Sequence, residues 1–111
     1  MGYCSDLYAK VHGSDLIKFK AALANNNLDD AFNSYGIEQL DENGYIHYEA
    51  NGLKWYSGYS DVEPINSIFA SSKYSVLLRV GEEVGDIECF SSIDNPYDHF
   101  QISTHTTVEI L

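Results

Sequence analysis

Apolar and polar residues alternate along residues 3–12, the first patterned stretch of the chain. The two alternating sets are Leu7, Ala9 and Val11 on one side, and Asp6, Tyr8, Lys10 and His12 on the other. A period of two is typical of a strand that buries one face. We therefore predict that the chain opens with a half-buried β-strand.

Two later segments have the spacing of amphipathic helices. Ser14 can cap a first helix, and Ser60 and Glu63 have capping-box spacing at the start of a second one. The apolar stripes that follow are Leu16, Phe19 and Leu23 in the first segment, and Val62, Ile65, Ile68 and Phe69 in the second. Each stripe predicts a helix that packs on the sheet through one side.

The strongest local signal is the sequence GYIHYEANGLKWYS at residues 44–57. Asn51 and Gly52 form the pair preferred in two-residue type I′ turns, because both positions need a positive φ. Pairing outward from this turn places Tyr48 opposite Trp55. We therefore predict two antiparallel strands joined at Asn51 and Gly52.

The rest of the chain predicts further strands. KYSVLLRVGEEVGDIECF (residues 73–90) has the pattern of a strand, an acidic loop bounded by glycines and another strand, and ISTHTTVEIL (residues 102–111) that of a final edge strand. The order is β-α-β-β-α-β with one or two extra strands. We predict a single α+β domain over residues 1–111, with a ferredoxin-like (split βαβ) antiparallel sheet and two helices on one face.

Charge is the most pronounced feature of the composition. The chain has 17 Asp and Glu residues against 6 Lys and Arg, a formal net charge of −11. Such a field repels phosphate backbones and anionic lipid headgroups, and it attracts basic proteins. No stretch approaches the roughly 18 apolar residues of a membrane span. The composition therefore argues against direct binding to nucleic acid or to membranes.

The start of the chain, MGYCSD, lacks the positively charged segment and the apolar run of a secretory leader. We therefore expect that this terminus is retained and that the protein stays in the cytoplasm. In a reducing compartment, Cys4 and Cys89 are expected to be buried thiols rather than a disulfide.

Residues with catalytic or metal-binding chemistry do not form a motif. A Cys4 nucleophile would need a histidine base, and no spacing places one beside it. The candidate metal ligands, which lack a His-x-x-x-His or calcium-loop pattern, are His47, His99, His105, Asp94 and Asp98. We expect no catalytic residue, metal or cofactor. A small enzyme with a Cys/His or carboxylate site stays as an alternative.

Three stretches resemble a group of small, mostly uncharacterised bacteriophage and prophage proteins. They are MGYCSD at the start, LKWYSGYSDVEPINSIF in the middle and YSVLLRVGEEVGDIECF later. Proteins of this group begin Met-Gly-Tyr-Cys-Ser-Asp, and they carry a Lys-Trp-Tyr and an Arg-x-Gly-Glu followed by Asp-Ile-Glu. The resemblance implies an accessory phage gene, and such genes often encode proteins that bind and disable or redirect a host machine.

Two binding hypotheses differ in whether the open face of the predicted sheet binds RNA or a protein. In a ferredoxin-like sheet Tyr8 and Tyr56 would lie side by side on this face, near Tyr45. Exposed aromatics there are the stacking platform of single-strand RNA-binding modules. The scarcity of basic residues argues against RNA, and tyrosines are also common in protein-binding surfaces. Coverage of the face by the C-terminal segment, or by a second copy in a homodimer, is the remaining alternative.

We therefore predict a non-enzymatic, cytoplasmic, phage-type interaction protein that binds and inhibits or redirects a basic host protein or nucleoprotein complex. Its carboxylates would act as a nucleic-acid mimic, as in an anti-defence protein, and its tyrosines as anchors. A single-strand RNA-binding module is the runner-up. The expected partner-binding residues are Tyr8, Tyr45, Tyr56, Asp61, Glu63, Glu82, Glu83, Asp86 and Glu88.

Overall fold

A five-stranded antiparallel sheet organises the computed structural model, which describes residues 3–34, 39–56, 58–104 and 107–111. The elements are β1 (Ser5–His12), α1 (Gly13–Asn25), β2 (Asn33–Ser34), β3 (Tyr45–Leu53), α2 (Glu63–Ser71), β4 (Val76–Gly81), β5 (Ile87–Phe90), the 3-10 helix η1 (Pro96–His99), β6 (Phe100–Thr104) and β7 (Thr107–Ile110). The sheet has the order β2-β3-β1-β4-β5, and β6 and β7 pair separately as a hairpin. β1 is therefore the central strand.

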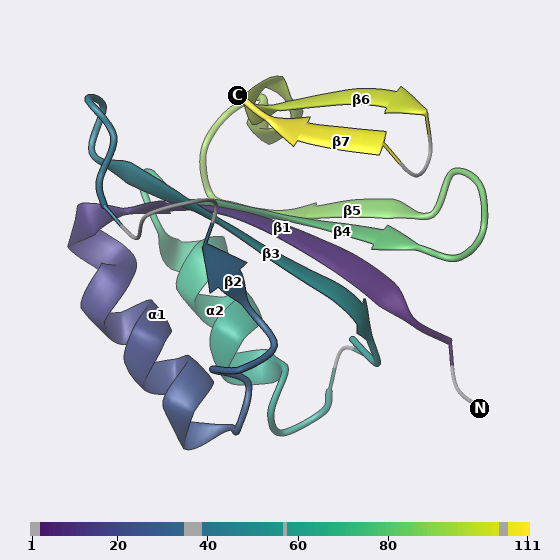
Figure 1. The fold of residues 1–111 in the computed structure, drawn as a ribbon, viewed down its shortest axis with the longest axis horizontal. Coiled ribbons are helices and arrows are strands. Elements are labelled where there is room, and N and C mark those ends of the chain that lie inside the picture. Colours follow the sequence, from purple (N-terminus) through teal and green to yellow (C-terminus); the bar gives the residue numbers. More distant parts are fainter. Residues whose placement is uncertain (1–2, 35–38, 57, 105–106) are drawn as a thin grey trace.

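The sheet is covered on both faces. Figure 1 shows α1 and α2 on one face, and the β6–β7 hairpin with η1 over the other, beside β4 and β5. The result is a three-layer arrangement of helices, sheet and hairpin. No helix among the described residues is long and apolar enough to cross a membrane.

Each face of β1 contributes to a different core. Leu7 and Ala9 are fully buried and pack with the two helices. Tyr8, between them in sequence, points to the opposite face, where it packs with Phe100 and Ile110 of the hairpin. Only 6% of Tyr8 is exposed. The predicted strand is confirmed, but both of its faces are buried rather than one.

The start of α1 is fixed by hydrogen bonds to two side chains, those of His12 and Asp15. His12, rather than Ser14, is the capping residue, and its Nδ1 accepts the Ser14 backbone N–H at 3.1 Å. This amide lies in the first turn, where the helix itself offers no acceptor. The buried Asp15 carboxylate accepts the hydroxyl groups of Ser72 and Ser75, each at 2.5 Å. These bonds join the start of α1 to the turn between α2 and β4.

The predicted hairpin at Asn51 and Gly52 is wrong. β3 runs through both residues as one strand and pairs with β1, so that Tyr48 lies opposite Ala9. Gly52 has the expected positive φ, +68°. It lies where the register of β1 and β3 shifts, and its N–H donates to Asp6 Oδ1 at 2.9 Å. The sequence signal marks an irregularity within a strand rather than a turn.

Trp55 gives the physical reason why the chain leaves the sheet after β3. Its side chain is only 5% exposed and lies in the core beneath the helices. The indole N–H donates to Asn66 Oδ1 of α2 at 2.9 Å, and the ring lies 5.8 Å from that of Phe32. Burial of the indole with a satisfied N–H therefore stabilises the path of the chain out of the sheet and outweighs the local turn preference of Asn51 and Gly52.

The predicted α+β class, with two helices on one face of an antiparallel sheet, is confirmed. Because β3 pairs antiparallel with both β1 and β2, β2 runs parallel to β1 with β3 between them. In the same way β4 runs parallel to β3 with β1 between them. This is the strand arrangement of a split βαβ sheet, and β5 is added at its edge. The segment before β3 returns to the end of β1, where the Gly13 N–H donates to the Gly44 carbonyl at 2.8 Å. The C-terminal segment, predicted as an edge strand of the sheet, forms its own hairpin instead.

Replacement of Tyr8 by alanine should unfold the protein more readily, because it leaves a cavity between the sheet and the hairpin. We expect a loss of about 3 kcal/mol or more in the free energy of unfolding, measured by urea denaturation. Tyr97, which is 47% exposed, is the matched control, and Tyr97→Ala should cost less than about 1 kcal/mol. Equal stability of the two variants would contradict the burial of Tyr8.

Candidate functional site

Tyr3 connects the start of the chain to the loop between β4 and β5. Its hydroxyl donates to Asp86 Oδ2 at 2.5 Å and accepts the Glu83 backbone N–H at 2.9 Å. Its own backbone N–H donates to the Tyr56 hydroxyl at 2.6 Å. Removal from water and the Asp86 carboxylate raise the pKa of the Tyr3 hydroxyl, so it remains a donor at neutral pH. Tyr3 therefore holds Tyr56 beside the acidic loop.

Arg79 offsets two of the carboxylates at this loop. Its Nη2 donates to Asp86 Oδ1 at 2.7 Å, and its Nε donates to Glu88 Oε1 at 3.0 Å. A third bond, from Nη1, reaches Ser5 Oγ at 3.0 Å. The hydrogen bond to Asp86 is the first cause of the raised pKa of Arg79. Asp86 and Glu88 are therefore held in place, and part of their charge is compensated within the protein.

Glu82 and Glu83 remain exposed beside this ion pair. The Glu82 carboxylate accepts the Cys4 backbone N–H at 2.5 Å, whereas Glu83 contributes its backbone N–H to the bond with Tyr3. Gly81 makes this packing sterically feasible, because a Cβ there would collide with the Tyr3 hydroxyl and the Asp86 carboxylate. The loop thus presents two exposed carboxylates on a frame fixed by the start of the chain.

Tyr59 and Glu63 extend this region beyond Tyr56. The rings of Tyr56 and Tyr59 lie 5.1 Å apart, and Tyr59 is 47% exposed. The Glu63 carboxylate accepts the Gly58 backbone N–H at 2.6 Å at the start of α2. The whole region, called here the tyrosine–carboxylate surface, consists of Tyr3, Tyr56, Tyr59, Glu63, Glu82, Glu83, Asp86 and Glu88.

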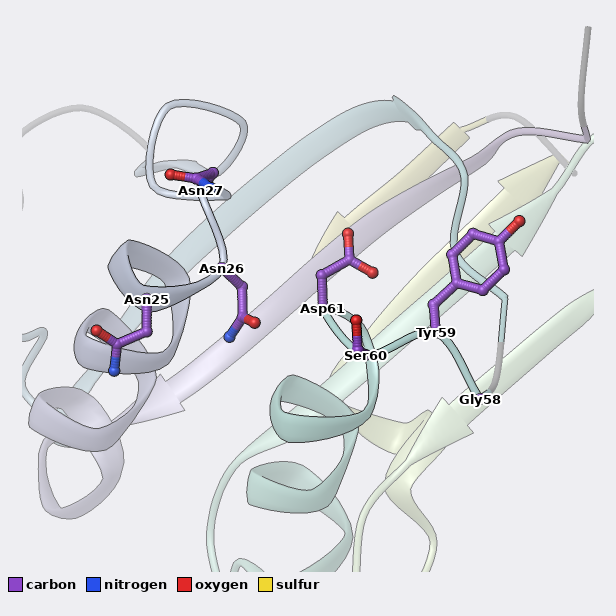
Figure 2. A pocket seen from close by; sticks show the side chains of 7 residues that line it. All are labelled: Asn25, Asn26, Asn27, Gly58, Tyr59, Ser60 and Asp61. Atoms are coloured by element: carbon purple, nitrogen blue, oxygen red, sulfur yellow. The ribbon is translucent and has the colours of Figure 1, made fainter.

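Asp61 lines an open polar hollow that adjoins this surface. Figure 2 shows residues 25–27, at the end of α1, along one side and residues 58–61, before α2, along the other. Amide, hydroxyl and carboxylate groups line the hollow, together with the Tyr59 ring. Because Tyr59 belongs to the surface and also lines the hollow, Asp61 lies next to the surface rather than within it.

Two of the predicted anchors lie elsewhere. The prediction that Tyr8 is an exposed binding residue is wrong, because the β6–β7 hairpin covers its face of the sheet. Tyr45 lies at the other end of β1, opposite His12, and its hydroxyl donates to the Tyr74 carbonyl at 3.2 Å. The structure therefore brings Tyr56 and the carboxylates of the loop together, but not with Tyr8 or Tyr45.

Sequence reasoning missed Tyr3 and Tyr59. Tyr3 precedes the first strand, and its role depends on contacts with residues more than fifty positions away. Tyr59 lies in a connecting segment with no periodicity. The signal that could have found it was compositional, since Tyr59 belongs to the aromatic group of Trp55, Tyr56 and Tyr59 just before the acidic start of α2.

Lys10 forms the centre of a second polar cluster, near the end of β1. Its Nζ lies 3.1 Å from His99 Nδ1 of η1 and 4.7 Å from the centroid of the Tyr45 ring. His47 lies opposite Lys10 in the register of β1 and β3, and its Nε2 is 3.8 Å from Asp41 Oδ2. The cluster thus joins β1, β3 and η1.

Burial shifts the pKa of several groups in this cluster. Desolvation lowers the pKa of Lys10, His47 and His99, and the charge of Lys10 lowers that of both histidines further. The Tyr45 backbone N–H, which donates to Asp41, lowers the pKa of that carboxyl. At neutral pH the cluster therefore holds an ammonium, two neutral imidazoles and a carboxylate.

The cysteines and histidines do not assemble a metal site in the part of the chain that the structure describes. No three His, Cys, Asp or Glu side chains there are placed to hold a metal ion. Cys4 and Cys89 are both thiols that form no disulfide. His105, one of the predicted candidate ligands, lies outside the described residues. His47 and His99 both lie near the Lys10 ammonium, whose charge disfavours a cation.

Comparison of the chain with protein-family models, with characterised proteins and with solved structures gave no match.

A methyl group at position 81 should destabilise the protein. In Gly81→Ala the added Cβ must displace the Tyr3 hydroxyl or the Asp86 carboxylate, and we expect a loss of about 1–3 kcal/mol in the free energy of unfolding. Val84→Ala, in the same loop and 89% exposed before the change, should stay within about 0.5 kcal/mol of the parent. A neutral Gly81→Ala would show that Tyr3 is not packed there.

Cys89 should react slowly with alkylating reagents. Burial raises the pKa of its thiol from 9.0 to about 11, so at about pH 8 it has roughly 100-fold less thiolate than an ordinary thiol. Iodoacetamide labelling of a Cys4→Ser variant, followed by mass spectrometry, measures the rate. Labelling should accelerate strongly in urea, and equal rates in the folded and unfolded states would contradict the prediction.

Proposed function

We propose that this protein is a non-catalytic, acidic interaction protein that binds a basic macromolecule through the tyrosine–carboxylate surface. The observation that carries the proposal is the pair of hydrogen bonds from Tyr3, to Tyr56 on one side and Asp86 on the other. They place aromatic side chains beside a group of carboxylates at one end of the sheet. Aromatic anchors next to acidic groups suit a basic protein partner.

The charge balance supports this choice of partner. The chain carries 17 acidic against 6 basic residues, and Arg79, the base in contact with this surface, is bonded to Asp86 and Glu88. Glu63, Glu82 and Glu83 are exposed. A negatively charged surface accelerates the encounter with a positively charged partner and repels nucleic acid.

The resemblance to small phage proteins supports a host protein as the partner. A phage accessory protein of this kind would meet, in the host cytoplasm, nucleases and other nucleic-acid-handling complexes with basic grooves. Carboxylates held on a fixed loop would imitate phosphates in such a groove, and the tyrosines would fill the adjacent pockets. The protein would then inhibit or redirect the host machine by occupying its nucleic-acid site.

The alternatives have less support. A single-strand RNA-binding module needs an open aromatic platform, and Tyr8, at the centre of the proposed platform, is buried. A Cys/His enzyme built on Cys89 would need a reactive thiolate there, and burial raises the pKa of that thiol to about 11. A homodimer through the open sheet face is also disfavoured, since the hairpin of the same chain covers much of it.

Neutralisation of the two exposed carboxylates should weaken binding to the partner. In the double variant Glu82→Gln and Glu83→Gln, the new amide at position 82 retains an oxygen for the Cys4 N–H, so the fold should persist. Affinity capture from host lysate at low and high salt supplies the partner, and surface plasmon resonance measures the purified pair. We expect association to slow by about threefold to tenfold, and the wild-type affinity to fall steeply as salt rises.

The matched control is the double variant Asp29→Asn and Asp30→Asn, which removes the same charge from the exposed segment after α1. It should change association much less. Equal effects of the two pairs would mean that net charge, and not this surface, governs binding. Measurable binding of the wild type to a labelled single-stranded RNA at physiological salt would instead favour the runner-up.

Removal of the exposed Tyr59 ring should shorten the lifetime of the complex rather than slow its formation. Tyr59→Ala removes a half-exposed ring without touching a charge, so we expect faster dissociation with a nearly unchanged association rate. Tyr97→Ala, with the same exposed fraction, is the control and should leave both rates unchanged. An unaltered dissociation rate in Tyr59→Ala would remove the tyrosines from the proposed contact.

A further inference from the structure

The open polar hollow beside the tyrosine–carboxylate surface has a chemistry of its own. Its volume is about 770 Å³, and the described residues that line it include one carboxylate, that of Asp61, and no positively charged side chain. Pockets for small molecules are usually enclosed and mostly apolar. An open hollow with polar walls suits instead a polar side chain that a macromolecular partner inserts.

Asp61 supplies this hollow with a carboxylate that the fold does not use. Among the described residues, no group lies within hydrogen-bond or ion-pair distance of it. An aspartate just before a helix commonly caps it, but α2 begins without a side-chain cap. The backbone N–H groups of Val62 and Glu63 donate instead to the Tyr59 carbonyl, at 3.1 and 3.0 Å. The Asp61 carboxylate is therefore available to donors from outside the chain.

The end of α1 forms the opposite wall of the hollow and is also negative. The partial negative charge of a helix lies at its C-terminal end, and α1 has no basic residue in its last turn to offset it. Asn26 Nδ2 donates to the Ala22 carbonyl at 2.7 Å, which fixes the orientation of this amide. Figure 2 shows its oxygen on the side of residues 60 and 61. Acceptor oxygens therefore face the hollow from both walls.

The wall formed by residues 58–61 has two further features that favour a cation. The positive end of the α2 dipole lies near it, but Glu63 in the first turn offsets this charge, and its carboxylate accepts the Gly58 N–H at 2.6 Å. Tyr59 contributes an aromatic ring that is about half exposed. The face of such a ring attracts cations and stacks well on a planar guanidinium.

We propose that this hollow receives the guanidinium group of an arginine side chain of the partner; in the choice of partner the inference rests on the proposed function. A guanidinium has five N–H donors in a planar fork and no acceptor, which matches walls that offer a carboxylate and amide oxygens. Two donors would bond the Asp61 carboxylate, and the plane would stack on the Tyr59 ring. The hollow would thus add a specific anchor to the general attraction of the tyrosine–carboxylate surface.

The test is an NMR titration of the isotope-labelled full chain with N-acetyl-arginine amide, followed through the backbone amide signals. N-acetyl-citrulline amide is the matched control, because its urea group has nearly the shape of a guanidinium without the charge. We expect signals of residues 25–27 and 58–61 to shift saturably with the arginine compound, with an apparent Kd on the order of 10 mM. The citrulline compound should bind at least about fivefold more weakly, and N-acetyl-lysine amide about threefold more weakly.

Sodium chloride at equal ionic strength corrects for screening. Equal binding of the citrulline compound would indicate a neutral polar ligand and overturn the proposal. Shifts with the arginine compound that are confined to the β4–β5 loop would also overturn it, because they would reflect general attraction to Glu82 and Glu83. Affinity for the lysine compound equal to that for arginine would contradict the guanidinium as the group that the hollow selects.

Two variants locate the site. Asp61→Asn keeps the shape of the side chain and removes its charge, so the arginine compound should bind at least about fivefold more weakly. Asp94→Asn removes an exposed carboxylate in the segment before η1 and should leave the affinity within about twofold. Unchanged affinity in Asp61→Asn would overturn the assignment. The comparison of the arginine and citrulline compounds on the wild type keeps the proposal testable even where Asp61→Asn does not fold.

This titration is independent of the proposed function, because it needs no partner protein. The double variant Glu82→Gln and Glu83→Gln should still bind the arginine compound in the hollow, with residues 25–27 and 58–61 shifting as in the wild type. Failure of the arginine compound to bind would overturn the hollow as a site and leave partner binding through the tyrosine–carboxylate surface unaffected. The two failures are therefore distinguishable.

Discussion

Burial of both faces of β1 is the constraint on which the rest of the structure depends. β1 is hydrogen-bonded on both sides, to β3 and β4, so side chains from its two faces fill two separate cores. The helices cover one face, and the β6–β7 hairpin covers Tyr8 and the apolar side of β4. A small domain with a single core buries a limited share of its surface, and a second core on the same sheet increases that share.

Because both faces of β1 are buried, the polar clusters of the protein lie at the two ends of this central strand. At the start of β1, Tyr3 and Arg79 gather carboxylates into one surface. Near its end, Lys10 lies at the border of the hairpin, where the face of the sheet is no longer fully covered. A residue with a long apolar stem and a charged head suits such a border, because the stem packs while the ammonium stays in contact with water. The two ends therefore differ in local charge, because carboxylates dominate the first, whereas the second balances the Lys10 ammonium against the Asp41 carboxylate.

Sequence periodicity correctly predicted those helices and strands in which the spacing of the apolar residues matches the buried side of the element. The first strand, both helices and the antiparallel pair formed by β4 and β5 are each present, because their apolar positions repeat with the period of the element. The hairpin prediction failed because the preference of Asn51 and Gly52 for positive φ is also satisfied at an irregularity inside a strand. Local turn chemistry alone does not distinguish these two contexts.

The candidate surface was predictable in part. Its carboxylates and Tyr56 could be named from composition and from their places in loops, since exposed loop ends are where charged side chains project. Tyr8 was misplaced because alternation shows which face of a strand a residue occupies, but not whether a distant segment covers that face. Tyr3 could not be found from sequence at all. Its importance comes from hydrogen bonds to Tyr56 and Asp86, which only the folded chain brings together.

Arg79 forms ion pairs with Asp86 and Glu88 and so reduces the net negative charge of the proposed binding surface. Its effect on order matters more than its effect on charge. A loop with unpaired carboxylates repels itself and must be ordered at a cost when a partner binds. Arg79, with Tyr3, fixes the frame of the β4–β5 loop before any encounter, and Glu82 and Glu83 stay exposed on that frame. Two carboxylates on a fixed frame suit the proposed imitation of a phosphate backbone better than a larger but mobile acidic loop would.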